Sequence, residues 1–493
     1  MSPSVEPFDE AKYKALMDGL DFQEINKSEL ENEFTIGAEY YGKKYTEAVS
    51  LVKVQKKTIP LGKMWLLATD GDHGSPDYQE NGVLYLLSEC VKEGYIEKDK
   101  CRYITEEKNM ELKRSCLHPG DIVVTKTGVY FGKSAVIPES IPEANTIAHV
   151  GKITLKPQYN PYYVSTFLNC KYGYAQLRRR GIKATRPEIK LVEFPDIIVP
   201  EFGEDLYSAI EQTVRIANNI LDEATDTVTK SSHMLAKALE VDWSINIEEN
   251  CAIVDFSKSF NISGRLDAEY YHPKFSHYYK IFEKFDTTSI PAEFDVFKNS
   301  GTDYAEDISD IGVIKTKQLT NSGVNTDGVE SYFSKETCAQ NKSTFIANND
   351  VIFASMGVGS LGKVSLFSYD GDKQFVTDST LRIYRAKKTA RILPEVLCVF
   401  LQSAIGQELI YRYVVGSTGI INIYDDDIAK IPIPVLDAEI QKDIAAKVQE
   451  SFALRRQSKQ LLEYAKQAFE IAIDQGEDAA LAWLKANVPN PEV

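Results

Sequence analysis

A long helical pattern near the middle of the chain constrains the fold more than any other feature. Apolar or small side chains recur every three or four residues between 204 and 240, and neither glycine nor proline interrupts the run after Gly203. This spacing places them on one side of a helix that is about 55 Å long at 1.5 Å per residue. The positions are Leu206, Ile210, Val214, Ala217, Leu221, Ala224, Val228, Ser231, Leu235 and Ala238.

A second stretch, from Ala438 to Ile473, repeats this pattern about 230 residues later. Its apolar or small positions are Ile440, Ile444, Val448, Phe452, Leu461, Ala465, Ala468 and Ala472. Taken singly, each pattern is typical of a helix packed on the core of its own domain. Because two matching helices each close a similar stretch of sequence, we expect them to pair in antiparallel fashion as a coiled coil.

The sequence that precedes each helix is also repeated. Ala-Glu-Tyr-Tyr at 38–41 returns at 268–271, and Gly-Asp-Ile-Val-Val at 120–124 returns as Asn-Asp-Val-Ile-Phe at 349–353. Gly-Lys at 132–133 returns at 362–363. Several matches in one order indicate an internal duplication in which a globular block and a helix are each used twice.

Within each block, short β-like runs alternate with turn residues, which predicts an α+β fold made of two mixed α/β domains. In the first block the predicted strands are Met64–Ala68, Val83–Leu87, Ile122–Thr125, Ser134–Ile137, Lys152–Leu155 and Asp196–Val199, with one helix over Pro161–Arg179. The predicted organisation is an acidic extension (1–33), block 1 (34–200), a spacer helix and linker (201–250), block 2 (251–435), a C-terminal spacer helix (436–475) and a tail (476–493).

Composition narrows the classes of function. The seven cysteines are scattered without a Cys-x-x-Cys pair, which indicates reduced thiols in a cytoplasmic protein and no zinc site. No apolar run is long enough to span a membrane. The net charge is −16, yet residues 34–200 carry +5 while residues 201–250 carry −8. Because local patches govern attraction to phosphate, the acidic total is compatible with DNA binding.

Three motifs bear on an enzymatic alternative. Asn-Pro-Tyr-Tyr at 160–163 resembles an amino-methyltransferase motif but lacks its second proline, so a helix start with proline at the first position is the better interpretation. Pro76-Asp77 with 106–108 is a loose nuclease pattern. Gly-x-Gly-x-x-Gly-Lys at 357–363 resembles a phosphate loop, but the repeat at 128–133 lacks the middle glycine, which favours a turn between strands.

Basic residues are concentrated before the first spacer helix, where five cations lie within 178–186. The matching stretch 415–422 is neutral and rich in hydroxyl, amide and glycine residues. One loop suited to phosphate and guanine and another suited to hydrogen bonding would fit two modules that recognise different DNA sequences. The predicted DNA-contacting residues are Lys126, Thr127, Lys133, Arg178, Arg179, Arg180, Lys183, Arg186, Ser355, Ser360, Lys363, Arg412, Ser417, Thr418 and Asn422.

Together these motifs resemble the specificity (S) subunit of type I restriction–modification systems. Asp-Gly-Asp-His-Gly-Ser-Pro at 70–76 and Gly-Val-Leu-Tyr-Leu at 82–86 are similar to runs found in that family. So are Ile-Pro-Ile-Pro at 431–434 and Glu-Ile-Gln at 439–441. The resemblance extends over about 34–473. It departs from the family pattern at Phe-Pro-Asp-Ile-Ile-Val-Pro (194–200), which leaves a related phage-defence methylation system as an alternative.

The resemblance implies a non-catalytic DNA reader. Each block would be a target-recognition domain for one half of a split, asymmetric site, and the two helices would set the gap between the halves. The implied partners are double-stranded DNA and two methyltransferase (M) subunits, and the family also allows motor-nuclease (R) subunits. S-adenosylmethionine would be bound by the M subunits, so this chain is expected to need no cofactor or metal. The alternatives are a stand-alone DNA methyltransferase or nuclease, and a scaffold that does not bind DNA.

Overall fold

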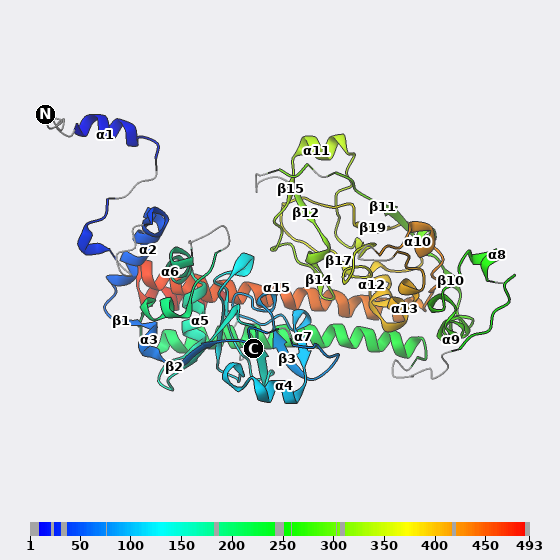
Figure 1. Ribbon diagram of the computed structural model, residues 1–493, viewed down its shortest axis with the longest axis horizontal. Coiled ribbons are helices and arrows are strands. Elements are labelled where there is room, and N and C mark those ends of the chain that lie inside the picture. The colour runs from blue at the N-terminus through cyan, green and yellow to red at the C-terminus, as the bar shows by residue number, and fades with distance from the viewer. Residues whose placement is uncertain are drawn as a thin grey trace. The chain divides into compact units, whose positions relative to one another are not determined.

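The structure, a computed structural model, describes residues 9–20, 24–30, 37–74, 76–181, 187–241, 251–257, 259–301, 303–305, 311–416 and 421–488. Its contacts divide the chain into two compact units (Figure 1). Unit 1 comprises Met1–Asn219 and Gln457–Val493, and unit 2 comprises Ile220–Arg456. Both contain sheets covered by helices, as the α+β prediction requires.

Unit 1 contains the shorter helices α1 (Glu10–Met17), α2 (Lys43–Lys53), α3 (Leu61–Met64), α4 (Glu106–Glu111), α5 (Pro161–Asn169), α6 (Lys171–Gly181) and α16 (Glu477–Asn487). Its strands are β1 (Thr58–Pro60), β2 (Trp65–Asp70), β3 (Val83–Leu86), β4 (Arg102–Ile104), β5 (Ile122–Thr125), β6 (Ser134–Val136), β7 (Ala144–Thr146), β8 (Val150–Leu155) and β9 (Ile198–Pro200). The predicted strands are therefore present, with ends shifted by one or two residues.

Unit 2 contains the shorter helices α8 (Phe260–Ser263), α9 (Pro273–Phe282), α10 (Ile290–Glu293), α11 (Lys335–Gln340), α12 (Pro394–Gln402), α13 (Ala404–Arg412) and α14 (Asp425–Ile428). Its strands are β10 (Thr287–Thr288), β11 (Phe294–Phe297), β12 (Ile311–Ile314), β13 (Leu319–Thr320), β14 (Gly323–Val324), β15 (Tyr332–Phe333), β16 (Val351–Ala354), β17 (Val364–Leu366), β18 (Phe375–Thr377), β19 (Leu381–Ala386) and β20 (Ile433–Pro434). Two long helices, α7 (Glu204–Ala238) and α15 (Ala438–Gln475), belong to both units by sequence.

The strand order is the same in the two units. Unit 1 has a four-stranded sheet β2-β8-β5-β6, a three-stranded sheet β4-β3-β7 and the pair β1-β9. Unit 2 has β11-β19-β16-β17, β15-β12-β18 and β10-β20, with the short hairpin β13-β14 in addition. Each three-stranded sheet contains one parallel pair, β3 with β7 and β12 with β18. The duplication predicted from the sequence is confirmed by this shared topology.

Buried central strands anchor the core of each unit. β5 (Ile-Val-Val-Thr) and β16 (Val-Ile-Phe-Ala) are buried at all four positions, and β-branched and aromatic side chains favour such pleated, covered strands. In unit 2 the rings of Phe353 and Tyr384 stack with centroids 5.8 Å apart. Burying a large apolar side chain of this kind stabilises the fold by about 1.5–3 kcal/mol.

The segment after the four-stranded sheet corrects one prediction. The single helix expected over Pro161–Arg179 is two helices, α5 and α6, separated by Cys170 in an extended conformation. The Asn160 side chain accepts a hydrogen bond from the Tyr163 N–H, and Pro161 occupies the first helical position, which confirms the helix-start interpretation of this motif. The break lets α6 turn back, and Gly173 makes room where its backbone meets the Phe167 carbonyl. Unit 2 repeats the corner with α12, α13 and Gly406.

The two long helices (green and orange-red in Figure 1) confirm the helical patterns. Most predicted positions are buried, and Ile440, at the start of α15, is an exposed exception. In unit 2 the Ser451 hydroxyl of α15 donates to the Ala224 carbonyl of α7 at 2.8 Å. In unit 1 the Phe469 ring of α15 lies 4.6 Å from the Tyr163 ring of α5. These contacts are compatible with antiparallel pairing, and a coiled coil over the full length of the helices stays a prediction.

Each unit also contains an arginine held over a repeated tyrosine pair. Tyr40 and Tyr41 pack edge to face with centroids 4.9 Å apart, as Tyr270 and Tyr271 do at the same spacing. The Arg179 guanidinium lies 4.7 Å from the Tyr40 ring centre, and the Arg412 guanidinium lies 4.5 Å from that of Tyr270. Such cation–π contacts contribute most when they are shielded from water.

Candidate nucleic-acid interface

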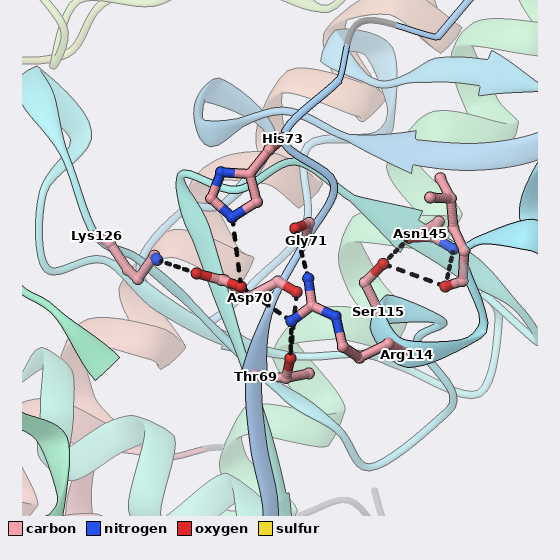
Figure 2. Close-up of polar contacts among 9 residues, drawn as sticks. Thr69, Asp70, Gly71, His73, Arg114, Ser115, Lys126 and Asn145 are labelled. Carbon is pink, nitrogen blue, oxygen red and sulfur yellow. Dashed lines mark hydrogen bonds and ion pairs between the residues drawn. The ribbon is translucent and has the colours of Figure 1, made fainter. Parts of the chain in front are cut away.

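A polar cluster forms in unit 1 where β2 and β5 end. β2 ends at Asp70, Lys126 follows β5 directly, and Arg114 lies in a 3-10 turn at Lys113–Ser115. Because β2 and β5 both pair with β8, their ends lie close together, although residues 70 and 126 are far apart in sequence. Figure 2 shows these three side chains pointing toward one another.

Asp70 is the centre of this cluster. Its two carboxylate oxygens lie 2.9 Å from Lys126 Nζ and 3.0 Å from Arg114 Nη1. Arg114 also donates to the Thr69 hydroxyl and, from Nη2, to the Gly71 carbonyl at 3.2 Å. The Arg114 side chain remains 56% exposed, whereas those of Asp70 and Lys126 are 19% and 9% exposed. Arg114 is therefore held firmly and still reaches solvent.

Buried hydrogen bonds fix the segment that carries Arg114. Ser115 Oγ donates to Asn145 Oδ1 at 2.7 Å, and Asn145 Nδ2 donates to Asn109 Oδ1 at 2.8 Å. The loop after β2, which follows Asp70, passes so close to β7 that a Cβ at Gly71 would lie 2.0 Å from the Thr146 carbonyl oxygen. Only glycine fits there, which explains the Asp-Gly sequence at this position.

His73 completes the exposed part of the cluster. Its side chain is 74% exposed, and its Nε2 lies 3.9 Å from Asp70 Oδ1. This distance is too long for a hydrogen bond, so His73 lies beside the cluster without being held by it.

Two opposing effects set the pKa of Asp70. Burial raises it, but hydrogen bonds and charge interactions from Lys126 and Arg114 outweigh burial, and the net result is a pKa below the usual value. The carboxylate therefore stays ionised at neutral pH. It neutralises Lys126 and leaves the cluster with the positive charge of Arg114.

We expect Asp70→Asn to lower the stability of unit 1 at pH 7 by about 2 kcal/mol, because nearly buried Lys126 loses its charged partner. The folded-state pKa of Asp70 is lowered, so its contribution is present above the unfolded value of about 3.9 and is lost as pH falls through the folded-state pKa. The difference between wild type and variant should therefore shrink below about pH 4. Urea unfolding at several pH values measures it, and a difference unchanged from pH 7 to pH 3 would contradict the assignment.

The predicted DNA-contacting residues of unit 1 differ in how far they are exposed. Lys126 belongs to the cluster, and Lys133 and Arg178 are partly exposed. Thr127 is buried. Arg179 and Arg180 are also buried, with Arg180 donating to the carbonyls of Gln176 and Asp196. Their burial argues against a phosphate contact: the guanidinium groups are accommodated by rings and carbonyls, which the sequence alone did not indicate. Lys183 and Arg186 lie outside the described residues.

In unit 2 the predicted residues do not form one surface. Ser355 is buried and donates to the Thr380 carbonyl at 3.0 Å. Ser360 and Lys363 lie in the turn between β16 and β17, as the turn interpretation of the glycine-rich motif predicts. Arg412 packs among aromatic rings, and backbone N–H and carbonyl groups pair Asn422 with Val415. Ser417 and Thr418 lie outside the described residues.

Equivalent backbone contacts precede and follow the basic loop of unit 1 and its counterpart in unit 2. The Glu188 N–H donates to the Gly181 carbonyl, and the Asn422 N–H donates to the Val415 carbonyl. Likewise, Ile189 and Ile423 donate to the carbonyls of the residues that follow β5 and β16. The described residues that flank the two stretches therefore make equivalent contacts in the two units, with Gly181 corresponding to Val415 and Glu188 to Asn422.

Unit 2 also has an open cleft of about 850 Å³ beside α13. Its walls carry both signs of charge: Arg265 pairs with Asp267, and Lys274 pairs with Glu408 at 3.2 Å. Because these charges are already matched, the cleft does not favour phosphate as the unit 1 cluster does.

Neither a membrane-spanning helix nor a metal-binding cluster occurs within the described ranges. No helix there has the length and apolar character needed to cross a membrane. Nor do three His, Cys, Asp or Glu side chains gather there in a group that could hold a metal ion.

A family model matches part of the second half of the chain. Residues 281–464 match the model of the type I restriction modification DNA specificity domain. No match is found among curated proteins.

Several solved structures are similar to the chain, including the following two. One is the HsdS subunit from Thermoanaerobacter tengcongensis, at 11% identity, 85% coverage of this chain, 97% coverage of that chain and a TM-score of 0.28. The other is the type I restriction–modification S subunit from M. genitalium, at 10% identity, 87% and 95% coverage and a TM-score of 0.33. The family-model match itself confirms, for residues 281–464, the predicted resemblance to the type I restriction modification DNA specificity domain family.

Proposed function

We propose that the chain is the DNA sequence-recognition subunit of a type I restriction–modification system or of a closely related methylation system. The observation that carries this proposal is the repeated topology. Residues 281–464 match a DNA specificity domain, and unit 1, most of which lies outside that match, has the same strand order as unit 2. A chain with two such domains suits a bipartite DNA site, because two linked readers combine their affinities through a fixed geometry.

The two units would read different half-sites. They share a scaffold but differ in charge, since residues 34–200 carry +5 and residues 251–435 carry −4. In our proposal, block 1 (34–200) and block 2 (251–435) are target-recognition domains, and the spacer helices in 201–250 and 436–475 keep the half-sites at a fixed separation. The extension at 1–33 and the tail at 476–493 have no assigned role in DNA recognition.

Chemistry on the DNA would be performed by partner subunits. We infer two adenine methyltransferase (M) subunits, which bind S-adenosylmethionine, with motor-nuclease (R) subunits as further partners. The chain itself would be non-catalytic. The acidic stretch 201–250, which includes α7 and carries −8, would repel DNA phosphate and suits a protein-facing surface. DNA would therefore contact the blocks and not the spacer.

Exchanging block 2 tests the bipartite reader. We expect replacement of residues 251–435 by the corresponding block of another such subunit to change one half of the methylated sequence. The other half and the gap should stay the same, because block 1 and the spacer helices are untouched. Mapping methylated adenines in host DNA measures all three. A change in both halves would contradict the modular assignment.

Assays on the purified chain, with and without M subunits, separate the alternatives. A stand-alone methyltransferase or nuclease should modify or cut DNA when the purified chain receives only S-adenosylmethionine or a divalent metal. A scaffold should assemble with its partners and show no salt-dependent affinity for DNA. The recognition subunit should direct methylation only together with M subunits.

A further inference from the structure

Some features occur in both units, whereas others occur in one unit alone. The tyrosine pair with its arginine and the glycine at the helix corner occur in both units. In addition, Asn169 in unit 1 and Gln402 in unit 2 each donate from the side-chain amide to a carbonyl in the strand beside them. Features present in both copies serve the common fold.

The Asp70 cluster is not repeated. The strand register places Lys298, one residue past β11, at the position of Asp70, and Ser355 at that of Lys126. Thr105 and Ser334 cap α4 and α11 in the same way. Counting forward from these caps places Ser343 at the position of Arg114. An ionic cluster in unit 1 thus corresponds to Lys298, Ser343 and Ser355 in unit 2, at the same place in the fold.

Arg114 is the part of this cluster that is available to a ligand. A guanidinium group has five N–H donors, and the three hydrogen bonds of Arg114 to Thr69, Asp70 and Gly71 occupy three of them. Among the described residues no further hydrogen bond of Arg114 is found, so two donors remain on a side chain that is 56% exposed. Because its orientation is already fixed, little rotamer entropy would be lost on binding.

Guanine matches these properties. Its O6 and N7 form a pair of acceptors in the major groove that arginine contacts in bidentate fashion, and this contact distinguishes it from the other bases. Asp70 neutralises Lys126, so the cluster presents one net positive charge, on Arg114, to an electronegative base edge. Three-point support suits a base edge, whose two acceptors have a fixed direction, and only a base contact would make the recognised sequence depend on Arg114.

We propose that Arg114 is a base-reading side chain of unit 1 that contacts a guanine edge in its half-site, and that Asp70 is a positioning residue that orients it. This inference rests on the proposed function, because it assumes that unit 1 reads one half of a bipartite site. It adds a specific residue, its partner and the base edge it recognises.

The test uses the full chain with its M subunits and maps methylated adenines. Arg114→Gln is expected to relax or change one base position in the half-site of unit 1 and to weaken methylation of the original site about 10- to 100-fold. The half-site of unit 2 and the gap should be unchanged. Arg114→Lys keeps the charge but loses the bidentate fork, so it should relax the same position.

Two further variants define the control and the role of Asp70. Arg102→Gln removes another exposed arginine of unit 1, on β4, and should alter no base position. Asp70→Asn should relax the same position as Arg114→Gln, and the double variant should lose no more than the single ones, because both changes act through one contact. A loss of thermal stability alone cannot produce such a position-specific effect.

Three results would overturn the inference. Equal weakening of all sequences, with a reduced slope against salt, would make Arg114 a phosphate contact. An unchanged recognised sequence in folded Arg114→Gln and Arg114→Lys would make the cluster structural. Relaxed recognition in the half-site of unit 2 would show that Arg114 does not read the half-site of unit 1. Failure of the proposed function is distinguishable, because then the wild-type complex itself would show no sequence-specific methylation.

Discussion

Gly173→Ala and Gly406→Ala are each expected to destabilise their unit by about 3 kcal/mol or more, among the largest single-residue effects in the chain. A Cβ at either position would lie 2.0 Å from a backbone carbonyl oxygen, that of Phe167 or Phe400, and 2.8 Å from the next Cα. Neither obstacle is a flexible side chain, so the second helix of the corner must move away from the first. Overpacking of this kind commonly costs about 1–3 kcal/mol and more where the backbone must shift.

Hydrogen exchange of the amides in α5 and α12 measures this effect separately for each unit. Gly37→Ala is the matched control, because a Cβ added at Gly37 would have no atom within 4 Å and the residue has a φ of −67°. That variant should change stability by no more than about 0.5 kcal/mol. If Gly173→Ala proved as stable as Gly37→Ala, the close packing of the α5–α6 corner would be wrong.

The second large effect is expected for Arg412→Ala, at about 3 kcal/mol. The guanidinium group donates to the Tyr270 carbonyl at 3.1 Å and to the Tyr279 hydroxyl at 2.7 Å. It also lies within 6 Å of four ring centres, those of Tyr270, Phe275, Tyr279 and Tyr413. Removal would therefore take this donor from the Tyr270 carbonyl and leave the Tyr279 hydroxyl with only the Tyr413 hydroxyl, 3.3 Å away, as a partner. It would also abolish several cation–π contacts and open a cavity among the rings.

Urea unfolding of unit 2 and the salt dependence of DNA binding together test this assignment. Arg412→Lys should be intermediate, because an ammonium group lacks the planar fork, and Lys280→Ala, at an exposed position on α9, is the control. The slope of DNA affinity against salt should be unchanged among variants that remain folded. A slope reduced by about one without loss of stability would instead support the phosphate contact predicted from the sequence.

The helical periodicity of two long stretches and the repeated motifs made much of the fold predictable. The patterns over 204–240 and 438–473 correspond to α7 and α15 within a few residues, because an uninterrupted helical period over many turns has no plausible alternative structure. The repeated motifs predicted the duplicated topology. The sequence does not predict the break at Cys170, since neither proline nor glycine occurs within 168–172. It depends on the close approach at Gly173, which is a tertiary contact.

The candidate interface was less predictable, for a physical reason. The density of cations in 178–186 suggested a surface patch, but aromatic rings and backbone carbonyls contributed from distant segments bury Arg179 and Arg180. Arg114, by contrast, gave no signal, because Asp70 and Lys126 lie 44 and 12 residues away from it in sequence. The available clue was the Asp-Gly-Asp-His run at 70–73, whose glycine is required by the close approach to β7.

The division of the chain has a consequence for its synthesis. Unit 2 is one continuous segment, whereas unit 1 joins residues up to Asn219 with residues from Gln457 onward. Phe469 covers Tyr163 and Phe167, and the Glu477 carboxylate accepts from the Gly203 N–H just before α7. When the ribosome has made the first 219 residues, these partners do not yet exist, and apolar surface stays uncovered while about 240 more residues emerge. The domain translated first is therefore completed last, and its nascent form is the stage most exposed to aggregation and to chaperones.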